Sequence, residues 1–130
     1  MPIITSLFAG ILGLMSMWLS AGAGGMRGKT GISIGDGGNT EMLLAMRKHQ
    51  NFTEYVPLAL ILIGLLEMAG TNEIALYVMG SLLVLARLAH GLGLKADTMS
   101  GFGRFFGAAC TALITVVASV WCIVNYARAL

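Results

Sequence analysis

Four long apolar segments, separated by short polar or glycine-rich stretches, dominate the pattern of this chain. Each is long enough to cross a hydrocarbon core, which takes a helix of about 20 predominantly apolar residues. The pattern therefore predicts four membrane-spanning helices, at residues 2–24, 41–69, 73–94 and 104–127. The connection at 70–72 is a tight turn, so the second and third helices are expected to be antiparallel neighbours.

Composition supports a membrane protein. Apolar residues make up 57% of the chain and charged residues only 11%, whereas a soluble domain carries about 25% charged residues. A chain of this length is enough for one domain, which we expect to span residues 1–130. The net charge of +2 is too small to indicate nucleic-acid binding. The predicted fold class is all-α, an integral membrane four-helix bundle.

Basic residues are distributed unevenly over the ends of the four segments. Six of them flank the first and third connections, and one lies near the C-terminus. By the positive-inside rule, the first and third connections face the cytoplasm and both termini face outward. The six residues are Arg27, Lys29, Arg47, Lys48, Lys95 and Arg104.

The second segment contains polar residues that share one helical face. Arg47, Asn51 and Glu54 are spaced i, i+4 and i+7. A helix over 41–69 is about 43 Å long against a core of about 30 Å, which puts Glu54 about 8–10 Å below the membrane surface. Charged residues at such depth face the bundle interior, pair with each other and mark functional sites. Two interpretations remain: a clasp between helices, or part of a binding site.

The third and fourth segments offer matching polar residues. Arg87 and His90 lie near the same end of the membrane, and antiparallel pairing brings Arg87 to the depth of Glu54, which it is expected to neutralise. Arg104 begins the fourth segment, either as an interfacial anchor or as part of the same site. Four cations with Glu54 as their carboxylate predict a pocket for a small anion that also carries an ammonium group. The four cations are Arg27, Arg47, Arg87 and Arg104.

The fourth segment also carries a stripe of small residues and both cysteines. The stripe predicts close helix packing, either within one subunit or at an oligomer interface. Cys110 and Cys122 are separated by about 18 Å on a helix, beyond disulfide reach, and are expected to be core thiols. The two histidines are far apart in sequence, so no metal site is predicted. The stripe comprises Gly103, Gly107, Thr111, Thr115 and Ser119.

Two motifs resemble those of a known family. "RKHQNFTEYVPLALILIGLLE" (47–67) is similar to the second-helix signature of the MAPEG superfamily, the membrane-associated proteins in eicosanoid and glutathione metabolism. The signature has Arg, then Asn four residues on, Glu three further, often Tyr next, and Pro within an apolar helix. "ARLAHGLGL" (86–94) resembles the third-helix motif, and Arg104 stands where the family has an Arg at the start of its fourth helix. The chain looks most similar to the small bacterial inner-membrane branch.

The resemblance implies a homotrimer that binds glutathione between neighbouring subunits, near the cytoplasmic face. Arg47 would hold a glutathione carboxylate, with Glu54 facing the amino group. Arg104 would lie near the sulfur as the catalytic residue. The remaining residues implied in glutathione binding are Asn51, Tyr55, Arg87, His90 and Arg27.

The activity implied by the resemblance is that of a glutathione transferase or peroxidase. The glutathione thiolate, as co-substrate, would attack a hydrophobic or lipid-like electrophile that arrives from the bilayer. Several active members carry a Tyr seven residues after the third-helix Arg, where this chain has Leu94. Two alternatives remain: a non-catalytic protein that binds glutathione or lipid, and a small transporter that uses Glu54 as its coupling carboxylate.

Overall fold

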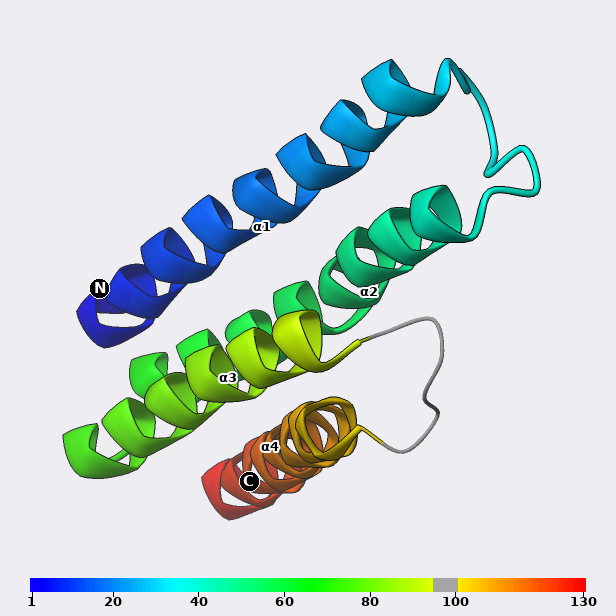
Figure 1. Ribbon diagram of the computed structural model, residues 1–130. Helices are drawn as coiled ribbons and strands as arrows, with labels where there is room; N and C mark the ends of the chain where they lie inside the picture. The colour runs from blue at the N-terminus through cyan, green and yellow to red at the C-terminus, as the bar shows by residue number, and fades with distance from the viewer. Residues whose placement is uncertain (95–100) are drawn as a thin grey trace.

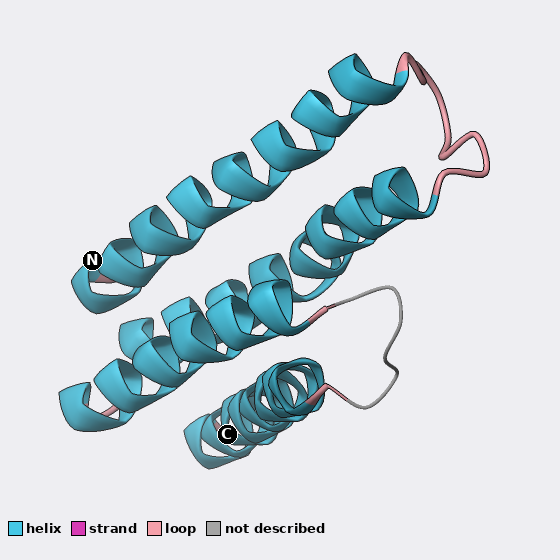
Figure 2. Ribbon diagram, in the orientation of Figure 1, coloured by secondary structure: helices cyan, strands magenta, loops and turns pink. Residues whose placement is uncertain are grey.

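A computed structural model describes residues 1–94 and 101–130, and its helices follow the four apolar segments closely (Figure 1). All four helices are long and apolar enough to cross a membrane. Loops occupy only the connections and the chain ends in the described part (Figure 2). The helices are α1 (Ile3–Thr30), α2 (Thr40–Met68), α3 (Glu73–Gly93) and α4 (Phe102–Ala129).

The first helix is longer than the hydropathy pattern predicted. It continues past residue 24 to Thr30, although this stretch is rich in glycine. It ends at Gly31, whose positive φ of 69° permits a left-handed cap in which its N–H donates to the Arg27 carbonyl oxygen. The predicted third connection and Lys95 fall largely in 95–100, outside the described residues.

The helices alternate in direction. The α1–α2 loop, the end of α3 and the start of α4 lie together at one end of the molecule, while both termini and the α2–α3 turn lie at the other (Figure 1). In the described residues α1 packs on α2 and α3, whereas α4 packs on α3 and α2 and does not contact α1. The bundle core includes Phe8, Leu12, Ile63, Leu66, Leu76, Leu83, Ile114 and Ala118.

The stripe of small residues on α4 lies against α3. A Cβ atom added at Gly103 would lie 2.8 Å from the carbonyl oxygen of Ala89, and one at Gly107 would collide with the backbone of Ala86. Thr111 is fully buried at the same interface. For these positions, the interpretation that the stripe packs within the subunit is confirmed.

Helix ends are stabilised by side chains that satisfy the first N–H groups. Asn39 caps α2 by accepting from the Met42 N–H at 2.9 Å. The start of α1 is capped from another helix: the Glu67 carboxylate on α2 accepts from the N–H groups of Ile4 and Thr5 at 2.8 and 2.7 Å. The Thr5 hydroxyl donates to it as well. These bonds join residues 62 and 63 positions apart in the sequence, so local sequence pattern does not indicate them.

The outer surface of the bundle is apolar. Leu14, Ile61, Leu85 and Val116 are each more than half exposed. Such a surface suits contact with lipid or with another subunit. Cys110 and Cys122 are partly buried and free, in agreement with their separation along α4.

Candidate functional site

The polar residues of α2 form a connected row on its surface. Arg47 donates to the side-chain oxygen of Gln50 at 2.9 Å, and the Gln50 amide nitrogen donates to Glu54 at 2.9 Å. Because these residues are three and four positions apart, one helical face carries all three side chains. Gln50 joins Arg47 and Glu54, the two charges that the sequence pattern identified. It follows Arg47 by three residues and precedes Glu54 by four, and this spacing could have revealed its role.

Arg87 lies behind this row, in the interior of the bundle. It is only 3% exposed. Its Nε and Nη2 donate to the Thr111 hydroxyl at 3.0 and 2.6 Å, and Nη2 also reaches the Gly107 carbonyl oxygen. Nη1 donates to the side-chain oxygen of Asn51 at 3.0 Å and more weakly to its carbonyl oxygen. Arg87 therefore ties α2, α3 and α4 together.

The expected pairing of Arg87 with Glu54 does not occur in this structure. Arg87 uses its donors on neutral oxygens, and Glu54 is exposed and accepts from Gln50 instead. The physical reason is that Thr111 and Asn51 lie closer to the buried guanidinium and satisfy its fixed fork of N–H donors. The prediction failed because depth along two helices does not specify which way each side chain points.

The bond from Arg87 fixes the orientation of the Asn51 side chain. A guanidinium has donors only, so the Asn51 atom that meets it has to be the amide oxygen. The amide NH2 group is therefore the donor that Asn51 can offer to a ligand, and Asn51 lines the neighbouring cavity. Arg87 thus influences the cavity by positioning Asn51, in addition to holding the helices.

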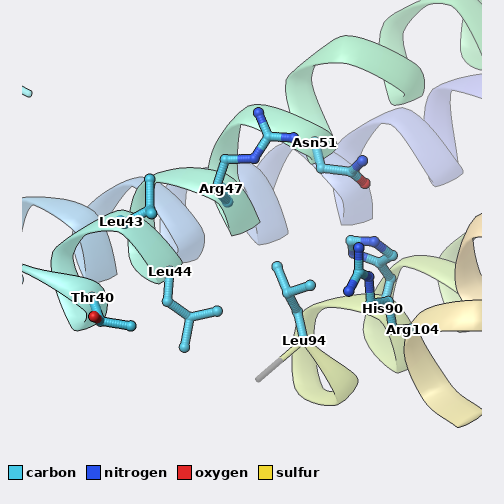
Figure 3. A pocket seen from close by; sticks show the side chains of 8 residues that line it. All are labelled: Thr40, Leu43, Leu44, Arg47, Asn51, His90, Leu94 and Arg104. Atoms are coloured by element: carbon cyan, nitrogen blue, oxygen red, sulfur yellow. The ribbon is translucent and has the colours of Figure 1, made fainter. Parts of the chain in front are cut away.

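That cavity, which we call the cationic pocket, opens between α2, α3 and the start of α4 (Figure 3). Its volume is about 250 Å³. Two arginines from different helices line it, and none of its eight described lining residues is acidic. An anionic ligand is therefore favoured there. The lining residues are Thr40, Leu43, Leu44, Arg47, Asn51, His90, Leu94 and Arg104.

Close contact between α3 and α4 positions Arg104 at this pocket. A Cβ at Gly93 would lie 2.7 Å from the Arg104 backbone nitrogen, so glycine is needed for the first turn of α4 to approach α3. His90 is buried beside Gly107 in the same interface. Leu94 also lines the pocket.

Besides Glu54 and Arg87, two further predicted ligand residues do not line the cationic pocket. Arg27 donates to the carbonyl oxygens of Ile32, Ser33 and Gly35, and so holds the α1–α2 loop. Tyr55 is 48% exposed, and its ring centroid lies 5.8 Å from the Arg87 Cζ atom. Within one subunit the structure thus brings together Arg47, Asn51, His90 and Arg104. The predicted residues outside the pocket lining are Arg27, Glu54, Tyr55 and Arg87.

Comparison with known proteins agrees with the motifs. The family model described as MAPEG family matches residues 5–124. The chain belongs to the MAPEG family. It is 30% identical over 122 residues to the inner membrane protein YecN of Escherichia coli strain K12, with 91% of each chain covered. The YecN protein of E. coli O6:H1 strain CFT073 matches to the same extent.

Membership in the MAPEG family and the four long helices make the protein a multi-pass membrane protein of a glutathione-related kind. The similarity covers all four helices, so the cationic pocket lies within the matched region.

Proposed function

We propose that this MAPEG protein binds glutathione in the cationic pocket and uses its thiolate on a hydrophobic electrophile, as a transferase or peroxidase. The observation that carries the proposal is the pair of arginines, Arg47 and Arg104, which converge from two helices on a pocket whose described lining has no acidic residue. Glutathione has two carboxylates, and charge-assisted hydrogen bonds to arginine are the strongest recognition that a small anion can receive.

Each pocket residue has a distinct part in this proposal. Arg47 binds a glutathione carboxylate, and the Asn51 amide donates to a peptide carbonyl. Arg104 lies near the sulfur, where a guanidinium lowers the pKa of the thiol and favours the thiolate. The thiolate then forms a bond to the electrophilic atom of the second substrate, whose leaving group or opened ring takes up the electron pair.

A site shared between subunits accounts for the residues that lie outside the pocket. The pocket volume of about 250 Å³ is below the roughly 300–1,000 Å³ of most ligand sites. Glu54 and Tyr55 are exposed on the surface of α2, where a neighbouring subunit could close over them. We therefore propose a homotrimer in which Glu54 meets the glutathione amino group at the subunit boundary. Native mass spectrometry of the detergent-purified protein measures the subunit number.

Titration with glutathione tests binding. The purified full-length protein is titrated by calorimetry beside the Arg47→Ala and Glu54→Ala variants. Loss of a charge-assisted bond is worth about 1.5–3 kcal/mol, so each variant should weaken binding by about 10-fold or more. Arg128→Ala, which removes an arginine at the opposite end of the bundle, is the matched control. Absence of wild-type binding would refute the proposal, and binding that survives both substitutions would place the site elsewhere.

A second candidate function is glutathione binding without turnover. It is favoured by Leu94, which brings no hydroxyl group to the pocket. The ultraviolet absorbance of the thiolate separates the two candidates, because catalysis needs a thiolate signal that Arg104→Ala removes. If Leu94 limits turnover, Leu94→Tyr should raise the rate of conjugation while leaving glutathione affinity nearly unchanged.

The transporter alternative has its own test. Glu54 lies with Arg47 toward one face of the membrane, whereas a coupling carboxylate is expected near the bilayer midplane, so its position argues against transport. Proton-coupled uptake into vesicles that Glu54→Gln abolishes would establish transport. We propose an inner-membrane location, as for YecN, with the first and third connections in the cytoplasm.

A further inference from the structure

A second cavity lies on the other side of α2 from the cationic pocket. It opens between α1, α2 and the end of α3, and its volume is about 490 Å³. Arg47 faces the cationic pocket, whereas its neighbour Lys48 faces this cavity. Leu44 contributes to both walls and separates the two spaces. The lining residues are Trp18, Leu19, Gly22, Ala23, Met26, Glu41, Leu44, Ala45, Lys48, Gly91 and Leu92.

Two opposite charges in this cavity are arranged by depth. Glu41 lies in the first turn of α2, and Lys48 lies two turns further along the helix, about 10 Å deeper at 1.5 Å per residue. Below them the wall is apolar and is formed by Leu19 and Trp18 of α1, which runs antiparallel to α2. From the loop end inward, the cavity thus presents an anion, then a cation, then an apolar surface.

We propose that this cavity binds an amine-bearing zwitterionic phospholipid, with phosphatidylethanolamine chemistry, from the leaflet next to the α1–α2 loop. In such a lipid the ammonium is outermost, the phosphate lies below it and the acyl chains lie deepest, which is the order that the cavity complements. Glu41 binds the ammonium, Lys48 binds the phosphate, and the acyl chains pass Leu19 and Trp18. An anionic lipid without an amine would place negative charge against Glu41, which disfavours it.

Glu41 and Lys48 are separated by about 10 Å along the helix axis, and the long lysine side chain shortens the distance that a headgroup has to span. A lysine in a membrane helix extends toward the interface and carries its ammonium upward along the helix. In the proposed complex the Lys48 ammonium therefore meets the phosphate closer to Glu41 than the backbone separation alone would place it. None of the residues named for lipid contact lines the cationic pocket, so the inference is independent of glutathione binding.

Trp18 makes the proposal measurable. The chain has two tryptophans, so Trp121→Phe leaves Trp18 as the single reporter at the cavity. The full-length protein is placed in phosphatidylcholine vesicles with a small fraction of brominated-chain lipid, which quenches nearby indole fluorescence. Phosphatidylethanolamine, phosphatidylcholine and phosphatidylglycerol are compared at the same fraction. We expect brominated phosphatidylethanolamine to occupy the site about two- to fivefold more than the other two, as one or two interfacial charge pairs allow.

Variants identify the charges responsible. Lys48→Ala and Glu41→Gln should each remove the excess quenching, whereas Lys29→Ala, which removes a cation at the same end but outside the cavity, should leave it. Glu41→Lys should transfer the preference to phosphatidylglycerol, a gain of signal that a misfolded protein would not produce. Equal quenching by the three lipids would overturn the proposal, as would an excess that persists in both Lys48→Ala and Glu41→Gln.

Discussion

Asn51 connects the buried core with the surface of the cationic pocket. Its amide oxygen accepts from Arg87 at 3.0 Å, which leaves the amide NH2 as the donor that Asn51 can offer in the pocket it lines. The substitution Asn51→Asp, which replaces the amide nitrogen by oxygen, therefore separates the contact with Arg87 from the contact with a ligand. Aspartate retains the acceptor for Arg87 and adds an opposite charge beside a buried cation, but it removes the donor toward the ligand.

We predict that Asn51→Asp folds with a thermal midpoint at or above that of the wild type and loses glutathione binding by about 10-fold or more. The loss arises because a carboxylate replaces a donor and repels the ligand's own carboxylates. Thermal unfolding in detergent and calorimetric titration measure the two effects. Unchanged affinity would show that the Asn51 amide does not contact the ligand.

Among helices, the start of α1 depends on a residue of α2. The Glu67 carboxylate accepts three hydrogen bonds from Ile4 and Thr5, and Pro2 supplies no side-chain cap. Glu67→Ala leaves these donors without their acceptor, which costs about 1–3 kcal/mol for a buried group. We expect the Ile4 and Thr5 amides to exchange hydrogen faster in this variant. Glu73→Ala, at the same end of the bundle, is the control, and equal exchange in the two variants would contradict the assigned cap.

The interface between α3 and α4 depends on small residues. A side chain at Gly107 would meet the Ala86 carbonyl oxygen and the His90 backbone. We predict that Gly107→Val destabilises the subunit by about 1–3 kcal/mol, as overpacking does, and displaces His90 from the cationic pocket. Gly10→Val is the matched control, because nothing lies within 4 Å of an added Cβ there. Denaturant unfolding followed by circular dichroism compares the two, and similar midpoints would refute the prediction.

Helix positions were predictable because length and hydropathy decide them. The end of α1 was not, since glycine at positions 24, 25 and 28 suggested a loop. Glycine costs a helix only about 1 kcal/mol per residue, so a helix already formed by the apolar segment continues through these positions until Gly31 adopts positive φ. Local propensity is therefore a weak guide to where this helix ends.

At the scale of the molecule, four alternating helices place both termini at one end (Figure 1). The distribution of Lys and Arg predicts that this end faces away from the cytoplasm. Alkaline phosphatase fused after Leu130 should therefore be active in a bacterial host, and the same enzyme fused within the α1–α2 loop should be inactive. The opposite pattern of activity would invert the proposed orientation and place the cationic pocket on the outer side.

Only part of the candidate site was predictable: Arg27, Glu54, Tyr55 and Arg87 do not line the cationic pocket. Helical spacing and antiparallel pairing identified Arg47, Asn51 and Arg104, and the pocket contains all three. The same reasoning paired Arg87 with Glu54, because it compared only the depth of charged residues along the two helices. Arg87 instead bonds Thr111, a neutral residue on another helix that this comparison did not include. Contacts between three helices depend on rotation of each helix about its axis, and a single sequence does not specify those angles.

The Glu67 cap has a consequence for how the protein is made. During synthesis α1 enters the membrane before Glu67 has been translated, so its first amides lack their final acceptor until α2 is complete. The two helices then close as a hairpin held at its open end by this carboxylate. Biogenesis is expected to proceed through the α1–α2 hairpin as the first stable intermediate, onto which α3 and α4 assemble to complete the cationic pocket.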